Sequence, residues 1–262
     1  MSDNLELKQP HFAEGQKEFR DKYRENLKGF YNGYVHVLLV YAIGALGLFY
    51  FISHIENVLW WEWAIVPLTL MGANIFEWWI HKFVMHKPHK WSGAKAIYSR
   101  HTLQHHQFFT EDEMRFAGPH DWRVTVFPPY ALAIFIAAMS APGVVVLSWL
   151  ISPNVGWLFI CSTTSFYLLY EFMHFCCHLE DNVVLRNTPF INTIRRHHAA
   201  HHNKGIMMGI NMNLTFPFAD WLFNTSDLDR GFWGTMFNGY STKYIKKEVL
   251  ELSLIHISEP TR

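Results

Sequence analysis

Hydrophobic and polar positions are arranged along this chain in long blocks. Segments 29–55 and 124–170 contain no Asp, Glu, Lys or Arg over 27 and 47 residues. A third apolar run, 63–80, contains a single charged residue, Glu77, close to its end. Because about 20 apolar residues are enough for a helix to cross a bilayer, all three runs are typical of membrane spans.

The longest run exceeds what one crossing needs. A Pro-Asn pair at 153–154 is a turn signal inside it and predicts two spans, about 126–151 and 155–173. The Pro-Gly pair at 142–143 either kinks the first of these or folds it into a re-entrant hairpin, and both alternatives stay open. We therefore expect an all-α integral membrane bundle of about four transmembrane helices.

The basic residues indicate the orientation of this bundle. All 22 Lys and Arg lie before the first span, between the second and third, or after the fourth, in groups of six, seven and nine. Since Lys and Arg favour cytoplasmic loops, both termini and the central loop are predicted to be cytoplasmic. The membrane is either a bacterial inner membrane or the endoplasmic reticulum.

Residues 1–33 form a polar N-terminal segment with an amphipathic pattern. Its apolar residues Phe19, Tyr23, Leu27 and Phe30 recur at helical spacing, and basic residues occupy the remaining surface. These basic residues are Lys17, Arg20, Lys22, Arg24 and Lys28. The helix either lies on the inner leaflet or packs on its own protein.

The other boundary lies near the C-terminal end. The main membrane-embedded domain is assigned to 34–252. Residues 253–262 differ in character from the sequence before them and are interpreted as a non-native tail. The formal net charge is zero, with 22 basic and 22 acidic residues, so no nucleic-acid partner is expected. Three cysteines are too few for a disulfide framework in a chain of 262 residues.

Histidine is the residue type that suggests chemistry. Four windows, 81–86, 101–106, 174–178 and 197–202, total 23 residues and hold 11 of the 17 histidines. The predicted topology places all four windows on the cytoplasmic side, at the membrane surface. The predicted metal ligands are His81, His86, His101, His105, His106, His174, His178, His198, His201 and His202.

The spacing within the windows supports metal binding. His101 and His105, like His174 and His178, are four residues apart and would share one helix face, suitable for holding one ion. His81 and His86 are five residues apart, about 140° from alignment on an ideal helix. One of these two is therefore expected where the helix ends or unwinds.

The last window predicts a three-ring face and a second ion. His198, His201 and His202 form an i, i+3, i+4 set, and His197 is an alternative to His198. Adjacent pairs at 105–106 and 201–202 are expected if neighbouring rings reach two different ions. Ten rings exceed the capacity of one ion, so two ions with about five nitrogens each are predicted, with positions left open for a reactant.

The ligand type narrows the chemistry. Imidazole suits Zn, Cu, Fe and Ni, and Cys176 and Cys177 are interpreted as packing residues on another helix face. A histidine site beside the hydrocarbon layer suits a lipid substrate, and attack on an unactivated C–H bond needs an oxidant derived from O2. The chain has no dinucleotide, haem or iron–sulfur motif, so an external electron donor is required.

The histidine motifs resemble the four boxes of the fatty acid hydroxylase / sterol desaturase superfamily. The boxes are His81-Lys-Phe-Val-Met-His86, His101-Thr-Leu-Gln-His105-His106, His174-Phe-Cys-Cys-His178 and His198-Ala-Ala-His201-His202. Two later segments, Asn213-Leu-Thr-Phe-Pro217 and Asp220-Trp-Leu-Phe-Asn-Thr225, resemble the region after the last box. The resemblance covers about residues 70–230.

This resemblance implies a membrane-bound non-haem di-iron monooxygenase that modifies lipids. It implies two Fe ions, O2 as co-substrate, a helical bundle and a cytoplasmic helical cap that binds the metal. The expected partners are a lipid such as a fatty acyl chain or sterol, membrane lipids, and a ferredoxin or cytochrome with its reductase. The product is either hydroxylated or desaturated, and Zn is a conceivable substituted metal.

Two glutamates are candidates for orienting ligands. Glu77 precedes His81 by four residues and Glu171 precedes His174 by three, so each carboxylate can accept the free ring N–H of a ligand. The alternative is an ordinary interfacial charge paired with Lys or Arg. Two weaker candidates are Asp220 and Asn213.

Two other functions fit a histidine-rich membrane chain. A metal transporter would place ligands and acidic residues along a path inside the bilayer, whereas these spans contain almost no acidic residues. A zinc-dependent lipid hydrolase would need a general base beside an open zinc, and Glu77 or Glu171 could serve.

Overall fold

The computed structural model describes residues 15–27, 29–111 and 113–257. Across this part of the chain the regular structure is helical, with no strand and two isolated β-bridges, Thr110–Glu113 and Leu228–Ile245. The predicted all-α class is therefore confirmed for the described residues. His11, residue 28 and the end of the tail at 258–262 lie outside them.

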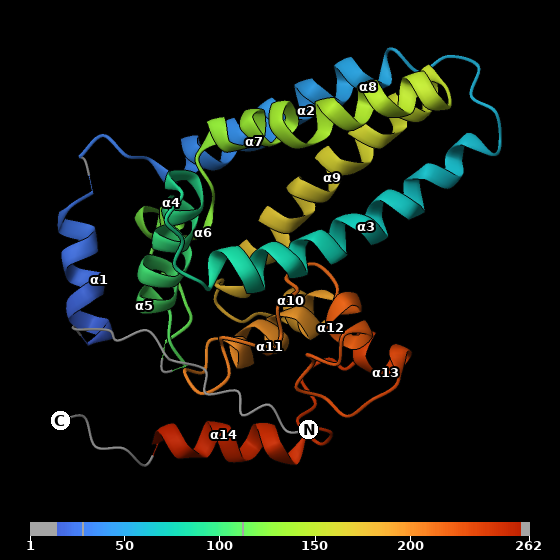
Figure 1. Ribbon diagram of the computed structural model, residues 1–262. Coiled ribbons are helices and arrows are strands. Elements are labelled where there is room, and N and C mark those ends of the chain that lie inside the picture. The colour runs from blue at the N-terminus through green and yellow to red at the C-terminus, as the bar shows by residue number, and fades with distance from the viewer. Residues whose placement is uncertain (1–14, 28, 112, 258–262) are drawn as a thin grey trace. The chain divides into compact units, whose positions relative to one another are not determined.

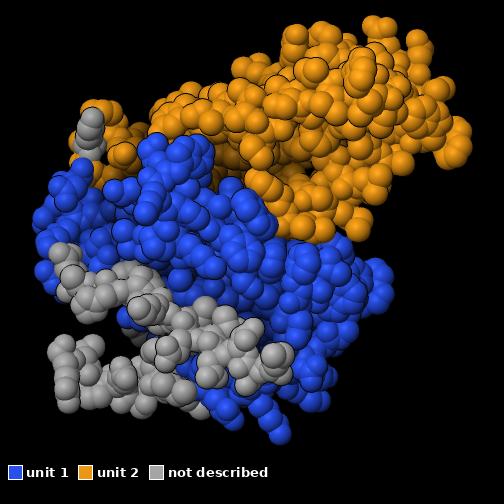
Figure 2. All heavy atoms as spheres, viewed as in Figure 1, with its two compact units in different colours: residues 1–26, 77–116, 176–262 blue, residues 27–76, 117–175 orange. Residues whose placement is uncertain are grey.

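The chain divides into two compact units, each built from segments distant in sequence (Figure 2). The first unit takes its described residues from 1–26, 77–116 and 176–262, and the second from 27–76 and 117–175. Each unit is described by itself below, with 3-10 and π-helical turns labelled η.

The second unit contains the long apolar helices (Figure 1). Its elements are α2 (Gly33–Ile52), η1 (Glu62–Ala64), η4 (Pro119–Asp121), α6 (Trp122–Thr125), α7 (Pro129–Phe135), η5 (Ile136–Ser140) and α8 (Ala141–Leu150), and α3 (Ile65–Ile80) and α9 (Pro153–Cys177) begin in it. All four predicted spans are thus helical. Two helical stretches of the described residues, Gly33–Ile52 and Pro119–Leu150, are long and apolar enough to cross a membrane. Crossing by α3, with 16 residues, and by α9 stays a prediction.

The third predicted span is a continuous helix from Pro129 to Leu150, so it forms no re-entrant hairpin. Pro142 lacks an N–H to donate to the preceding turn, and the π turn η5 ends just before it, at Ser140. The break between the third and fourth predicted spans lies where the Pro-Asn pair predicts it, because α8 ends at Leu150 and α9 begins at Pro153.

Close contacts bind α2 and the π turn η5 to α9. The Tyr41 hydroxyl donates to the carbonyl of Leu168 over 3.4 Å, and the Ser140 and Thr163 hydroxyls lie 2.9 Å apart. A Cβ on Gly44 would lie 2.6 Å from Leu168, so glycine permits this approach. The remaining faces carry large exposed apolar side chains, such as Phe49 and Trp149, as expected of helices that contact lipid.

The first unit consists of short helices and loops (Figure 1). Its elements are α1 (Gln16–Glu25), η2 (His81–Met85), α4 (Ser92–Arg100), η3 (His101–His105), α5 (His106–Phe108), α10 (Val183–Asn187), α11 (Ile191–His201), α12 (Phe218–Leu222), α13 (Phe232–Met236) and α14 (Lys247–Ile257). Its apolar core includes Phe108, Phe109, Ile194, Met212 and Leu214, each no more than 1% exposed.

Candidate metal centre

Two π-helical turns in the first unit carry the first two histidine windows. In η2 the N–H of His86 donates to the carbonyl of His81 over 3.2 Å, and in η3 the N–H of His106 donates to the carbonyl of His101. A hydrogen bond to the fifth preceding residue widens the turn, so residues five apart come to share a face. The Nε2 atoms are 3.1 Å apart in each pair.

Two groups of ring nitrogens gather inside this unit, and within each group the potential ligand atoms lie within 4.8 Å of one another. The first group is His81, His86, His101, His106 and His201, and the second group is His105, His178, His198 and His202. All nine side chains are buried, none more than 5% exposed. The groups adjoin, because the rings of His106 and His202 stack with centroids 4.3 Å apart.

The Nε2 separations match the edges of a metal coordination sphere. Neighbouring Nε2 atoms are 2.8–3.3 Å apart in the first group and 3.0–3.1 Å apart in the second. Imidazole nitrogens bind zinc at about 2.0–2.1 Å, which separates two ligands at right angles by about 2.9 Å. The donor sets therefore fit one metal ion each.

Backbone carbonyls set the tautomer of two rings in the first group. The Nδ1 of His81 bonds to the carbonyl of Met212, and the Nδ1 of His201 bonds to the carbonyl of Ile210 over 2.8 Å. A carbonyl only accepts, so each Nδ1 carries the proton and each Nε2 presents its lone pair to the group.

The second group is oriented in the same way by another segment. The Nδ1 of His178 donates to the carbonyl of Met114 over 2.8 Å, and the Nδ1 of His202 donates to that of Phe109 over 2.6 Å. Both Nε2 lone pairs therefore face the Nε2 of His198, 3.0–3.1 Å away. A cation at the centre would receive these lone pairs.

Burial keeps five of these rings neutral. Desolvation lowers the pKa of His81 to about 4, and it holds the pKa values of His86, His106, His201 and His202 well below the usual range. Neutral imidazole is the form that binds metal, so these five rings are ready to bind a metal ion near neutral pH.

The partition of the rings differs from the one that spacing suggests. His101 and His105, expected to hold one ion together, belong to different groups, because the π turn pairs His101 with His106. In α11, His198 shares the second group with His202 while His201 joins the first. Residues 201 and 202 diverge by about 100° on a helix, which lets their rings reach different groups.

The adjacent pairs divide as the two-ion hypothesis expects. His105 and His202 lie in the second group, whereas their neighbours His106 and His201 lie in the first. His174, the tenth predicted ligand, belongs to neither group. It lies in the second unit, on α9, which ends at Cys177, so His178 follows the helix rather than sharing a face with His174.

His197 is directed to another partner. Its Nε2 lies 2.9 Å from a carboxylate oxygen of Asp220, and both side chains are at most 1% exposed. The alternative in which His197 replaces His198 as a ligand is therefore wrong for this structure, which puts His198 in the second group.

Glu77 does not receive the ring of His81, contrary to the prediction from their spacing. Its carboxylate accepts the N–H groups of Leu214 and Thr215 and the Thr215 hydroxyl at 2.5 Å. The acceptor for the His81 ring is the carbonyl of Met212. Glu77 therefore acts on His81 indirectly, by fixing the loop that carries this carbonyl.

Asp220 holds the same loop from the other side. It accepts the N–H of Met212 at 2.9 Å and that of Asn213 at 2.7 Å, and the Asn213 side chain accepts the N–H of Asp220 at 3.0 Å. Both predicted weaker candidates therefore support the carbonyl that orients His81. The sequence did not predict the backbone carbonyls that orient the rings, because every residue has a carbonyl and the sequence does not indicate where it points.

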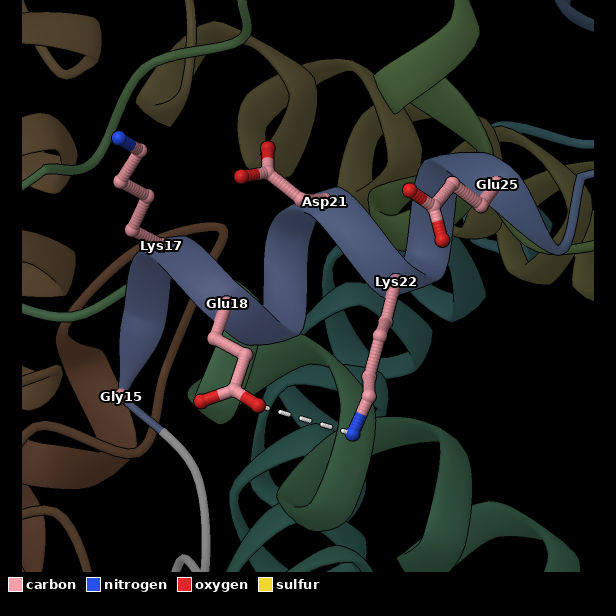
Figure 3. A pocket seen from close by; sticks show the side chains of 6 residues that line it. All are labelled: Gly15, Lys17, Glu18, Asp21, Lys22 and Glu25. Atoms are coloured by element: carbon pink, nitrogen blue, oxygen red, sulfur yellow. Dashed lines mark ion pairs between the residues drawn. The ribbon is translucent and has the colours of Figure 1, made fainter.

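Other predicted residues lie outside the two groups. The Glu171 carboxylate accepts the N–H of Phe127 at 3.2 Å. Cys176 and Cys177 are buried, as packing residues should be. A surface hollow along α1 is lined by charged side chains such as Lys22 and Glu18, which pair at 3.8 Å (Figure 3). None of the residues that line this hollow is one of the predicted ligands.

Comparison of the chain with protein-family models, curated proteins and solved structures finds no match. Support for a metal centre therefore comes from the positions of the histidine rings. The first unit holds two adjoining, buried groups of histidines that could bind metal ions.

Proposed function

We propose that this protein is an O2-dependent di-iron oxidoreductase of the fatty acid hydroxylase / sterol desaturase superfamily. About four helices embed it in the membrane, a cytoplasmic helical cap holds the metal, and the substrate is a lipid that it hydroxylates or desaturates. The observation that carries this proposal is the convergence of nine buried Nε2 atoms into two adjoining groups of five and four.

The donor set is one that iron accepts. Neither group contains a carboxylate or thiolate among the described residues, and neutral imidazoles suit iron. When bound, two iron ions would supply the redox chemistry that activates O2 for attack on a C–H bond. For hydroxylation, the C–H group, O2, two electrons and two protons yield an alcohol and water.

The chain contributes ligands, orientation and exclusion of water. The ring of Phe109 is fully buried and stacks on His178 with centroids 3.9 Å apart, which shields the second group. Buried Met212 borders the first group through its carbonyl contact with His81. Such apolar surroundings keep bulk water from a reactive centre.

The alternative of a zinc-dependent lipid hydrolase needs a free general base. The two carboxylates that sequence suggested for this role are engaged elsewhere, Glu77 with Leu214 and Thr215 and Glu171 with the N–H of Phe127. This observation favours the oxidoreductase over the hydrolase. The lipid substrate is supported by the two apolar helices, Gly33–Ile52 and Pro119–Leu150.

The electrons come from a separate protein, a ferredoxin or cytochrome with its reductase. The test is to load the purified chain in nanodiscs with Fe(II) without oxygen and measure bound iron. The loaded protein is then incubated with a lipid extract, a ferredoxin, its reductase, NADPH and ¹⁸O2. We expect about two iron ions per chain and either ¹⁸O in a lipid alcohol or a new double bond with O2 consumption.

A variant that lacks His106 and His202 is the matched control, because it removes one ligand from each group. It should bind little iron and form no product. Tight zinc binding by the wild type, with ester cleavage and no lipid-dependent O2 consumption, would overturn the proposal in favour of the hydrolase. Failure to bind any metal would overturn both.

A further inference from the structure

Helix α1 holds backbone carbonyls close to the second histidine group. The side-chain amide of Gln16 donates to the carbonyls of Phe108 at 3.0 Å and Glu113 at 2.8 Å. The guanidinium of Arg20 donates to the carbonyl of Arg115 at 2.6 Å. Three hydrogen bonds thus connect α1 to a segment more than 90 residues away in the sequence.

The same segment orients two ligands of the second group. The carbonyl of Phe109 accepts a hydrogen bond from the Nδ1 of His202, and Phe109 directly follows Phe108, which Gln16 contacts. Met114, whose carbonyl accepts the Nδ1 of His178, lies between the contacts of Gln16 and Arg20. The side chains of α1 therefore hold the residue before the Phe109 carbonyl and the residues on both sides of the Met114 carbonyl.

The packing of α1 reinforces these contacts. Arg20 is only 7% exposed, with its guanidinium carbon 4.6 Å from the centre of the Phe108 ring, and the Tyr23 ring meets Phe108 edge-on at 5.4 Å. The sequence placed Arg20 on the outer surface of this helix, and the structure corrects that. Its buried contacts favour the hypothesis that α1 packs on its own protein.

The outer face of α1 lacks the pattern of a leaflet-bound helix. Figure 3 shows Lys17, Glu18, Asp21, Lys22 and Glu25 extending from it, two positive and three negative charges. A helix bound to an anionic membrane surface would carry mainly Lys and Arg there, above an exposed apolar face.

We propose that α1 is a clamp that sets the metal affinity of the second histidine group alone, with Gln16 and Arg20 as positioning residues. Their contacts keep the Phe109 and Met114 carbonyls aimed at the rings of His202 and His178. The first group takes its orienting carbonyls from Ile210 and Met212. This inference rests on the proposed metal-binding function.

The test measures metal content of the full-length chain, not activity. Wild type and the Gln16→Ala/Arg20→Ala variant are titrated with Co(II) and followed by absorption and metal analysis. Loss of outer partners of metal ligands typically weakens binding about 10–100-fold. At a buffered free Co(II) concentration that just saturates the wild type, we expect the content to fall from about two ions per chain to about one. Lys17→Ala/Lys22→Ala, on the exposed face of α1, should keep two.

Combination with ligand variants identifies the affected group. His86→Ala leaves the second group intact, so adding Gln16→Ala/Arg20→Ala should weaken the remaining ion by the same 10–100-fold. His198→Ala disables the second group, so adding the same pair should change nothing. Arg20→Lys, which keeps a cationic donor, should restore part of the affinity when Gln16 is retained.

Three outcomes would overturn the clamp. One is unchanged binding of two ions by Gln16→Ala/Arg20→Ala, and another is equal weakening of both ions. The third is an effect that persists in the His198→Ala background. Should the double variant not fold, Gln16→Ala alone is read by the same criteria. A wild type that binds no metal would instead refute the proposed function.

Discussion

His81 and His86 are five residues apart in sequence, yet their Nε2 atoms lie 3.1 Å apart in the structure. The π turn between them closes with a hydrogen bond from the N–H of His86 to the carbonyl of His81. The second π turn brings His101 and His106 equally close. Four of the five rings of the first group therefore come from two copies of one local geometry.

Removal of one ring from either group should cost one ion. We expect His86→Ala to lose the first ion and His198→Ala the second, because each Nε2 borders at least two others in its own group. Metal analysis after Fe(II) loading should give about one ion per chain for each variant. His120, whose side chain is 50% exposed, provides the control, and His120→Ala should retain two ions. Full occupancy in either ligand variant would contradict the grouping.

Asp220→Ala should weaken the first ion selectively. The carboxylate accepts the N–H groups of Met212 and Asn213, and its loss releases the carbonyl that orients His81. The expected loss of affinity is about 10–100-fold. Competition with a chromophoric chelator measures it for each ion. Asp181→Ala, at an exposed carboxylate, is the control, and equal weakening of both ions would argue against this role.

Metal removal should destabilise the protein. The Nε2 lone pairs of His178 and His202 are directed at the Nε2 of His198. Without a cation between them, these lone pairs have no positive charge to stabilise them. An ion at 1,000 times its Kd would add about 4 kcal/mol to the free energy of unfolding. Chelation should lower Tm by several degrees, and Co(II) should restore it. The test is thermal unfolding followed by tryptophan fluorescence, and an unchanged Tm would speak against preorganised metal sites.

The buried pair of Arg196 and Asp227 should make stability depend on acid pH. Burial alone raises the pKa of the Asp227 carboxyl, but two 2.7 Å hydrogen bonds from Arg196 and its charge outweigh this and hold the pKa below the usual value. The unfolded state, with a pKa of about 3.9, thus binds the proton first as pH falls. The stabilisation is complete above about pH 4 and is lost below it.

Asp227→Asn tests this sign. At pH 7 it leaves the charge of Arg196 buried without its partner, and we expect a cost of about 3 kcal/mol. The difference from wild type, measured by chemical unfolding, should shrink as the pH falls toward 3, because the wild-type carboxyl then takes up its proton in the unfolded state. A difference that is constant from pH 7 to pH 3 would show that the pair does not govern acid stability.

The pattern of residues was enough to predict much of the molecule. Apolar runs predicted helices at all four segments, and the pair at 153–154 predicted the break before α9. The four histidine windows contain every member of both groups, because clustered histidines are rare outside metal sites. Sequence also suggested His174, which belongs to neither group. Helical spacing could not reveal that His178 follows the end of α9.

Which residues could bind metal was therefore determined by the sequence itself, through composition and local spacing. Only the tertiary structure decided how the rings divide between the two groups. In the π turn η3 the hydrogen bond spans five residues rather than four, which puts His101 and His105 in different groups. It also decided what orients the rings. Carbonyls of Met212 and Met114 take that role rather than nearby glutamates, because carbonyl direction depends on how distant segments pack.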